Sequence, residues 1–395
     1  IKGRVSFTGG AVDAERACLW SRLASRVFAV VARFGCATAD ELYAGACGVA
    51  WEDVLREGAS IAVAARGTND GLRNSHFAAL RVKDAVCDRL SEVTGARPAV
   101  DTEDPDARIA LTIRGERASL ELDLSGDPLF KRLPREAARV KTSHVLRPDY
   151  AALVLAEAGW PRACAEARAD GCALPVLVDA CCAGGGLELE AAGILLDRAP
   201  GRDRARWGFE GWAHHDADAW KALVEEADSR ADAVRAAVES MGAPAIVATD
   251  VEGGAVEFAR RILRKAGIAR YVAFEPADAV TLAQTAPTRR KSPALLAQAA
   301  PARPVVVADG IGTSLNRLPQ LLALITGLRG SPEFAGAAFT VLTRDGAIAR
   351  SLGGEPVRAL AVKPNNEDAR VLTFAPAAEA TGADDSHRSA PAPCA

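Results

Sequence analysis

The second half of the chain alternates between short apolar runs and helical patterns, and this alternation restricts the fold more than any other feature. Runs of strand length (PVLVDA, AIVATD, YVAFE, RPVVVAD, AAFTVLT) are separated by segments whose apolar residues recur with helical periodicity. This order predicts a mostly parallel sheet that is covered by helices. Two further strand-like runs, VRALAV and RVLTFA, predict a hairpin at one edge of that sheet.

The first third of the chain has a different rhythm. Strand-like runs, beginning with KGRVSF, return as neighbouring pairs between helical patterns, which favours an α+β layer. A basic connector leads to the helical pattern PDYAALVLAEAGW, with Pro148 well placed in its first turn. We therefore expect four parts: an α+β region over 1–130, a basic linker with a lead-in helix over 131–160, the parallel-sheet domain over 161–375, and a disordered tail over 376–395.

Several classes of protein are disfavoured by composition. At 395 residues the chain is long enough for two or three packed domains, and it has neither an apolar stretch of membrane length nor a signal-peptide core. We therefore expect a cytoplasmic protein. The nine cysteines are odd in number and show no CxxC pairing, so we expect reduced thiols and no metal site.

A formal net charge of −3 argues against a surface that is basic throughout, yet one segment concentrates cations. Residues 131–147 contain six lysines and arginines against a single glutamate, a cluster that suits phosphate groups as well as it suits a solvated linker. A second basic stretch, TRRK, lies at 288–291 within an insertion over 284–302 whose role the sequence leaves open.

Three consecutive glycines, Gly184 to Gly186, follow the first strand of the second half, at the point where the chain turns into a helix. Ligands of open α/β sheets bind at such carboxyl ends of strands. A dinucleotide fingerprint would require glycine at position 189, which is Leu189 here, so a nicotinamide-dependent dehydrogenase is disfavoured.

Acidic residues close three successive strands of this half: Asp179, Asp250 and, one short loop beyond its strand, Asp278. Each alone is compatible with a helix cap. Together they offer a carboxylate to a cationic amino group, one to a pair of ribose hydroxyls and one to an adenine amino group. This set favours S-adenosylmethionine as the cofactor.

Several long segments resemble the bacterial THUMP-domain methyltransferases that modify guanine N2 of large-subunit ribosomal RNA (UPF0020-type putative RNA methylases). The similarity extends over roughly residues 3–375. It is carried by ACLWSRLASR, LRNSHFAALRVKDAV, RPAVDTEDPDARIAL, LDLSGDPLFKR, DRAPGRDRARWGFEGWAHHD and ATDVEGGAVEFARRILRKAGI. The resemblance implies an N-terminal THUMP/ferredoxin-like region that binds RNA, followed by a Rossmann-like class I methyltransferase domain. It also implies direct methyl transfer from S-adenosylmethionine, without a metal.

The family's motifs assign residues to these roles. The family's Asp-Pro-x-Cys-Gly-Ser-Gly-Thr loop corresponds here to residues 179–186, in which only part of the pattern is kept. The residues that we expect to bind the cofactor are Asp179, Cys182, Gly184, Gly185, Glu190, Asp250, Glu252 and Asp278.

The chain departs from the family most clearly at the catalytic loop. The family's Asn-Pro-Pro-Tyr-Gly motif orients an exocyclic amine and stacks an aromatic ring on the base. Here the aligned residues are Asp309, Gly310, Ile311 and Gly312, without the prolines or the aromatic ring. We expect Asp309 and the Gly310 carbonyl to be catalytic if the enzyme is active. The alternative is a catalytically inactive relative that binds RNA, either alone or together with the cofactor.

Two further sets of residues carry expectations. Trp207, Phe209 and Trp212 of RWGFEGW are expected to pack over the parallel sheet rather than to stack on a base. The polar and basic residues expected to contact RNA are Arg66, Asn69, Arg73, Asn74, Lys83, Arg132 and Arg135.

Overall fold

The computed structural model describes residues 3–133, 145–171, 173–242, 244–250, 252–276, 304–311, 318–330, 334, 336–344 and 354–376. The chain divides into two compact units. Unit 1 comprises Ile1–Arg132 and Ala199–Ala227, and unit 2 comprises Leu133–Arg198 and Asp228–Ala395. The predicted disordered tail lies outside the described residues except for Pro376, as does the 284–302 insertion.

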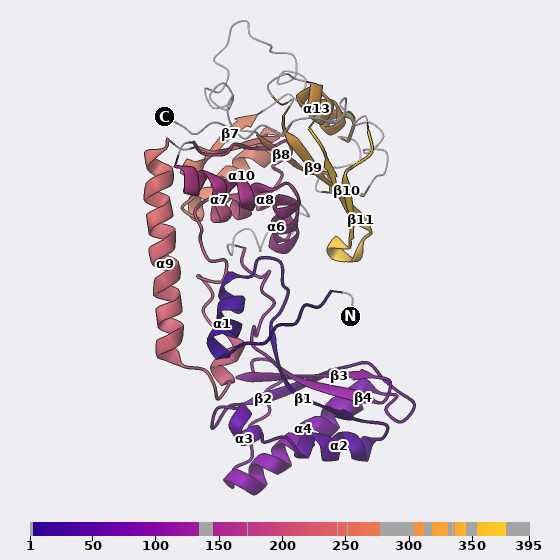
Figure 1. The fold of residues 1–395 in the computed structure, drawn as a ribbon. Coiled ribbons are helices and arrows are strands. Elements are labelled where there is room, and N and C mark those ends of the chain that lie inside the picture. The colour runs from indigo at the N-terminus through magenta and orange to yellow at the C-terminus, as the bar shows by residue number, and fades with distance from the viewer. Residues whose placement is uncertain are drawn as a thin grey trace, which may run out of the picture. The chain divides into compact units, whose positions relative to one another are not determined.

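Unit 1 is built on a four-stranded sheet with α2 and α4 on one face (Figure 1). In the strand order β1-β4-β3-β2, only β2 and β3 run parallel. Apolar side chains at alternate positions pack against α2 and α4, and on β4 the positions between them are polar: Arg117, Ser119, Glu121 and Asp123. The elements are α1 (Ala11–Trp20), β1 (Phe28–Gly35), α2 (Ala39–Cys47), α3 (Trp51–Val54), β2 (Ile61–Arg66), α4 (Ser75–Thr94), β3 (Ala107–Arg114), β4 (Arg117–Asp123) and the short helix η1 (Gly208–Gly211).

The segment over 199–227 belongs to unit 1, although the sequence places it within the methyltransferase-like half. Trp207 and Phe209 are buried in the core of unit 1, where their rings stack with centroids 5.3 Å apart. The Phe209 N–H donates to the Leu124 carbonyl at 3.0 Å, just beyond β4. The prediction that these rings serve burial is confirmed, but the prediction that they cover the parallel sheet is wrong.

Unit 2 is built on a seven-stranded sheet in the order β10-β11-β9-β8-β5-β6-β7. The five strands from β9 to β7 are parallel, and β10 and β11 form an antiparallel hairpin at the edge, as predicted. The strands are β5 (Leu177–Asp179), β6 (Ile246–Asp250), β7 (Val272–Pro276), β8 (Val305–Asp309), β9 (Ala338–Thr343), β10 (Arg358–Val362) and β11 (Ala369–Phe374).

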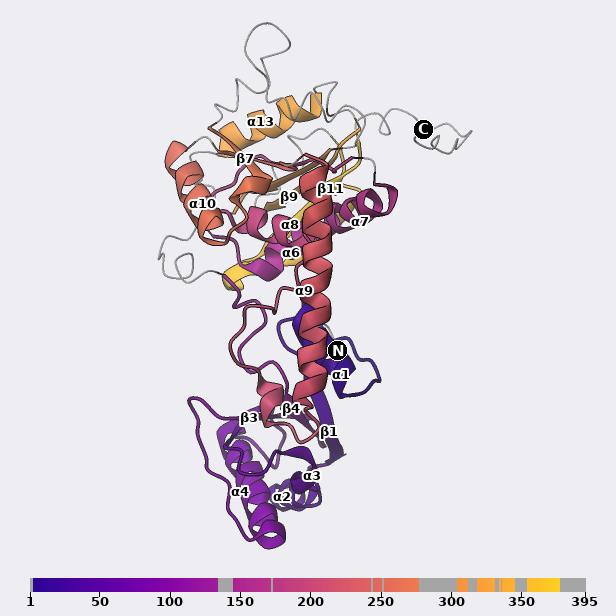
Figure 2. The same cartoon turned by 90° about the vertical axis from the view of Figure 1, so that its left-hand side faces the viewer.

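Helices cover both faces of this sheet, and Figure 2 shows α13 on the opposite face from α6 and α8. Within β8, Val305 and Val307 join the core under α6, α7, α8 and α10, whereas Val306 and Ala308 join the core under α13. A strand that is buried on both faces must be apolar throughout, which explains the VVVA run. The helices are α6 (Pro148–Glu157), α7 (Trp160–Asp170), α8 (Gly186–Leu195), α9 (Ala217–Ser240), α10 (Gly253–Lys265) and α13 (Leu318–Gly330).

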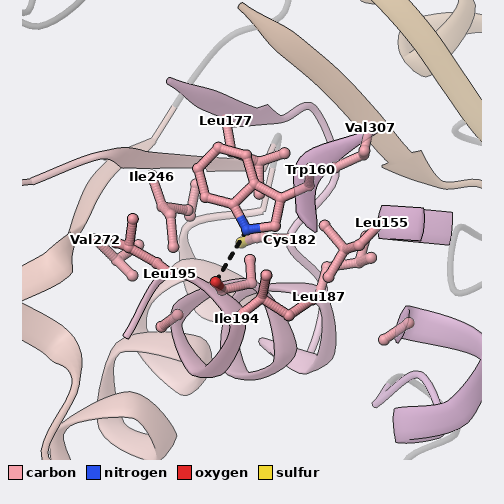
Figure 3. Close-up of a cluster of buried hydrophobic side chains, with 14 of the residues drawn as sticks. Leu155, Trp160, Leu177, Cys182, Leu187, Ile194, Leu195, Ile246, Val272 and Val307 are labelled. Carbon is pink, nitrogen blue, oxygen red and sulfur yellow. Dashed lines mark hydrogen bonds between the residues drawn. The ribbon is translucent and has the colours of Figure 1, made fainter. Parts of the chain in front are cut away.

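Trp160 is fully buried at the start of α7, among side chains of α8, β5 and β6 (Figure 3). Its indole N–H donates to the Ala191 carbonyl at 3.0 Å. The Cys182 side chain, from the glycine turn between β5 and α8, packs in the same cluster. This core therefore fixes the start of α8 beneath the strand ends where the candidate site lies.

Two elements differ from the expectations. Among residues 3–10, where KGRVSF predicts a strand, the structure has no regular element. The long helix α9 has no counterpart among the predicted elements; it begins in unit 1 and ends in unit 2. Among the described residues, no helix is both long enough and apolar enough to cross a membrane.

Candidate functional site

Three aspartates end three neighbouring parallel strands of unit 2. Asp179 closes β5, which lies between β6, closed by Asp250, and β8, closed by Asp309. All three side chains are buried. Parallel strands end at the same edge of a sheet, so the topology brings together carboxylates that are separated by 71 and 130 residues in the chain (250 − 179 and 309 − 179).

A tight turn joins β5 to α8 at this edge. The Cys182 N–H donates to the Thr249 carbonyl at 2.8 Å, and the Gly185 N–H donates to the Cys182 carbonyl at 2.7 Å. Gly185 has a φ of +79°, in the left-handed region, and a Cβ there would lie 2.9 Å from Leu263 Cδ1. Ala183 also has a positive φ, of 40°, which is unusual for a residue with a side chain. The turn therefore brings backbone to the strand ends where bulkier residues would not fit.

Asp250 holds this turn in place. Its Oδ2 accepts the Ala183 N–H at 3.0 Å, and its Oδ1 accepts the Glu252 N–H at 2.9 Å. One carboxylate thus connects the turn after β5 to the start of α10 after β6. The contacts align the Asp250 carboxylate for further hydrogen bonds at the strand edge.

Asp179 and Glu188 form a buried acidic pair beneath the turn. Asp179 Oδ1 accepts the Cys181 N–H at 2.9 Å, but Asp179 Oδ2 and both Glu188 oxygens receive no hydrogen bond. Burial raises the pKa of Asp179 to about 7. Burial and, after it, the charge of Asp179 raise the pKa of Glu188 well above its ordinary value. A proton held between the two carboxyl groups is therefore favoured over two charges.

Asp309 begins the loop in place of the family's catalytic motif. Its Oδ1 accepts the Ile311 N–H at 2.9 Å, which closes a local turn, and the Gly310 N–H extends the β8–β9 pairing by donating to the Leu342 carbonyl at 2.8 Å. The Asp309 side chain is thereby held at the edge next to Asp179. Gly312 lies outside the described residues.

The other residues expected to bind the cofactor are distributed around this edge. Cys182 and Gly184 lie in the turn, and burial raises the pKa of the Cys182 thiol, so that side chain serves the core. Glu190 is buried in the second turn of α8, and Glu252 is exposed at the N-cap of α10. Asp278 lies outside the described residues. The roles of all these residues in cofactor binding stay predictions.

Several residues expected to contact RNA have hydrogen-bond partners within unit 1. The Asn69 amide donates to the Cys36 and Gly115 carbonyls at 2.7 and 3.0 Å, and Asn74 caps α4 by accepting the Phe77 N–H. Arg132 donates to the Leu129 and Arg22 carbonyls at 3.1 and 2.9 Å. Polar side chains with these backbone partners stabilise loops, and the roles of Asn69, Asn74 and Arg132 in RNA binding stay predictions.

The remaining residues of that set differ from one another. Lys83 forms an ion pair with Asp84 at 2.6 Å, and the Arg73 Nε–H donates to the Asp70 carbonyl at 3.2 Å. Arg66 is exposed on β2. Arg135 lies outside the described residues.

Two residues that the sequence analysis did not single out also shape the edge. Glu188 supplies the second buried carboxyl, and the Thr249 hydroxyl donates to the Asp179 carbonyl at 3.0 Å. An acidic residue in the first turn of a helix is ordinary in sequence, so only the structure distinguishes Glu188. Among the described residues, no group of three or more His, Cys, Asp or Glu side chains could hold a metal ion.

Models of three protein families match the chain. The RlmL ferredoxin-like domain matches residues 1–28, the THUMP domain matches 36–123, and the RMKL-like methyltransferase domain matches 168–290. These matches confirm the predicted order of a THUMP and ferredoxin-like region followed by a methyltransferase domain.

Curated relatives carry the same kind of name. The chain is 37% identical over 350 residues to a ribosomal RNA large subunit methyltransferase K/L of Syntrophotalea carbinolica, a match that covers 88% of this chain and 46% of the relative. It is 34% identical over 375 residues to the protein of that name from Allochromatium vinosum, covering 94% of this chain and 47% of the relative. The chain thus spans about half the length of the curated relatives it matches.

Solved structures share the fold. A putative methyltransferase complexed with SAH, SMU.472, aligns with a TM-score of 0.70 at 21% identity, covering 93% of this chain and 88% of that one. At this level of identity the likeness concerns the fold, which is that of a class I methyltransferase.

Proposed function

Because the chain is homologous to the ribosomal RNA large subunit methyltransferases K/L and joins a THUMP domain to an RMKL-like methyltransferase domain, we propose that it is an S-adenosylmethionine-dependent RNA methyltransferase. The proposed substrate is guanine N2 of large-subunit ribosomal RNA. Such a substrate would also place the protein in the cytoplasm.

The observation that carries the proposal is the edge of the parallel sheet, where three buried carboxylates surround a tight glycine-containing turn. The cofactor fits this edge because it has a cationic end and ribose hydroxyls, both of which carboxylates recognise. Asp250 and Asp309 both place negative charge near Asp179, which a cationic amino group at this edge would offset. The solved putative methyltransferase of the same fold was complexed with SAH, the product form of this cofactor.

Each acid of the edge has a role in the proposal. Asp250, already oriented by the Ala183 and Glu252 N–H groups, accepts the ribose hydroxyls. Asp179 faces the amino end. When bound, S-adenosylmethionine would supply an electrophilic methyl group that a nitrogen attacks directly, with S-adenosylhomocysteine as the leaving group.

Asp309 and the backbone of Gly310 orient the nucleophile. An exocyclic amine is a weak nucleophile, and acceptors that bind its N–H groups direct its lone pair toward the methyl group. A carboxylate in place of the family's asparagine accepts these hydrogen bonds and also favours the positive charge that develops on the nitrogen. The alternative of a catalytically inactive relative receives no support from the two curated relatives described above, which are both named as methyltransferases.

Transfer of a labelled methyl group from S-adenosylmethionine to unmodified large-subunit ribosomal RNA tests the proposal. We expect incorporation into the RNA and N2-methylguanine after its digestion to nucleosides. An absence of transfer from folded protein that binds both RNA and cofactor would contradict the proposal and would favour the inactive alternative.

A further inference from the structure

The face of the unit 1 sheet that α2 and α4 leave uncovered carries a row of polar residues across all four strands. Arg66 of β2 pairs with Thr112 of β3, Thr112 pairs with Ser119 of β4, and Ser119 pairs with Arg33 of β1. Residues directly paired on neighbouring strands point to the same face. The apolar neighbours in sequence, such as Leu111, belong to the core on the other face.

A second pair lies beside this row. Arg114 and Arg117 are directly opposite each other where β3 and β4 meet at their turn. The register therefore places four arginines at one end of the uncovered face. We call this group the arginine face: Arg33, Arg66, Arg114 and Arg117, all of them exposed.

The acids of the same sheet face are neutralised at its other end. Glu121, which is buried, accepts two hydrogen bonds from the Arg4 guanidinium at 2.6 and 2.9 Å. Asp123 is likewise buried and forms an ion pair with Arg26. The carboxylates of this face are thus compensated by cations from outside the sheet.

The arginine face has no such compensation. Within the described part of the chain, none of its four guanidinium groups forms an ion pair, and the Arg66 Nε–H donates only to the Thr112 hydroxyl, at 3.1 Å. Asp70 and Glu116, both exposed, lie in the adjoining loops, so four cations stand against two acids. Like charges directly opposite on a sheet destabilise it, as at Arg114 and Arg117, so stability does not explain the arrangement.

The chemistry of the arginine face suits a chain of phosphates. A guanidinium group binds a phosphate through two hydrogen bonds, and the four exposed arginines present one such group on each strand of the sheet. Strands lie about 4.8 Å apart, so the outer arginines of the row, three strands apart, are separated by about 14 Å at their Cα atoms. This spacing exceeds one phosphate group and fits a polymer.

We propose that the arginine face binds the phosphodiester backbone of the RNA substrate. This inference rests on the proposed function, which supplies RNA as the polyanion. The aromatic ring of this sheet face, Phe28, lies at the far end under the Arg4 guanidinium, at 5.5 Å, so the arginine face binds backbone rather than stacked bases. Its contribution is therefore independent of base sequence and sensitive to salt.

Equilibrium binding of a fluorescent fragment of unmodified large-subunit ribosomal RNA to the full chain tests the proposal. The variants are the doubles Arg33→Gln with Arg66→Gln and Arg114→Gln with Arg117→Gln. The control double, Arg162→Gln with Arg235→Gln, removes two exposed arginines of unit 2 that are paired with Glu166 and Asp232.

We expect each arginine-face double to weaken RNA binding about tenfold or more at moderate salt and to reduce the slope of log affinity against log salt by about 1.5. The control double should change affinity less than twofold. Unchanged affinity and slope in both test doubles would overturn the proposal, as would binding of polyglutamate as tight as that of RNA.

Two further measurements separate this inference from the proposed function. Binding of S-adenosylhomocysteine should be the same in all variants, which also verifies that unit 2 is folded. If the wild type transfers methyl groups and the test doubles bind RNA as tightly as the wild type, the arginine-face proposal is wrong and the proposed enzyme function stands. If the test doubles bind RNA more weakly but no form of the protein transfers methyl groups, the arginine-face proposal stands and the proposed enzyme function is wrong.

Discussion

The carboxyl groups of Asp179 and Glu188 lie next to each other in the interior of unit 2, both fully buried, and three of their four oxygens receive no hydrogen bond. The neighbouring Asp250 and Asp309 add negative charge around Asp179, and each of them already accepts a backbone N–H. The pair is therefore held together in the folded protein by a proton, which links the stability of unit 2 to pH.

The pair predicts that the protein loses stability as pH rises. A carboxyl group whose pKa is raised on folding stabilises the folded state at low pH, and this contribution is lost as pH increases through the raised value. For Asp179, with a pKa near 7 in the folded state and an ordinary value near 4, the loss falls between about pH 4 and 7. Urea unfolding at pH 5 and pH 8 should show a decrease on the order of 2 kcal/mol or more.

Glu188→Gln should flatten this dependence. The amide removes one acid and can donate to Asp179 Oδ2, so the variant should be the more stable form at pH 8 and differ little at pH 5. Glu166→Gln, on the exposed surface of α7, is the matched control and should follow the wild type. Equal pH dependence in Glu188→Gln and the wild type would show that the pair holds no proton.

The glycine turn predicts a large effect of a single methyl group. Gly185→Ala introduces a Cβ at a φ of +79°, 2.9 Å from Leu263 Cδ1 and 3.3 Å from Ala259. We expect a loss of about 1–3 kcal/mol in the free energy of unfolding. In Gly254→Ala the added Cβ meets open space within α10, so this control should be neutral or slightly stabilising. Two substitutions with equal effects would mean that the turn is not constrained as described.

The position and hydrogen bonds of Asp250 predict that the cofactor's ribose binds at the end of β6. Asp250→Ala should weaken S-adenosylhomocysteine binding, measured by calorimetry, by about 10- to 100-fold, because hydrogen bonds to a charged group are lost. Glu257→Ala, on the exposed side of α10, should bind as the wild type does. If Asp250→Ala binds S-adenosylhomocysteine as tightly as the wild type does, the ribose does not bind at this strand end.

The contacts in unit 1 predict that two adjacent histidines, His214 and His215, contribute unequally to stability. His215 Nδ1 lies 2.8 Å from Oε1 of the buried Glu15, which connects the 199–227 segment to α1, whereas His214 is exposed. His215→Ala leaves a buried carboxyl without its partner and should cost about 1–3 kcal/mol of stability. His214→Ala should change stability by no more than about 0.5 kcal/mol. Thermal unfolding of the two variants tests this assignment, and a larger loss of stability in His214→Ala than in His215→Ala would contradict it.

The parallel sheet could be predicted because its strands are buried on both faces and must be apolar throughout. Val305 to Ala308 show this directly, since alternate residues enter different cores. The convergence of Asp179 and Asp250 then follows from the topology of such sheets.

Other features depend on pairings between distant parts of the chain that periodicity does not reveal. Trp207 and Phe209 are apolar enough for either core, and only tertiary packing places them in unit 1. Arg33 and Arg66 become parts of one row through strand register, although 33 residues separate them (66 − 33). The polar contacts of Asn69 were missed for the same reason, since its carbonyl partners come from two other loops.

The central claim is that the strand edge around Asp309 catalyses methyl transfer. The most direct test measures transfer of labelled methyl from S-adenosylmethionine to unmodified large-subunit ribosomal RNA by the wild type and by Asp309→Ala, with RNA and cofactor binding checked for both. We predict transfer by the wild type and a loss of at least 100-fold in the variant with both affinities retained. Equal transfer by the two proteins, or none by a wild type that binds both ligands, would contradict the account.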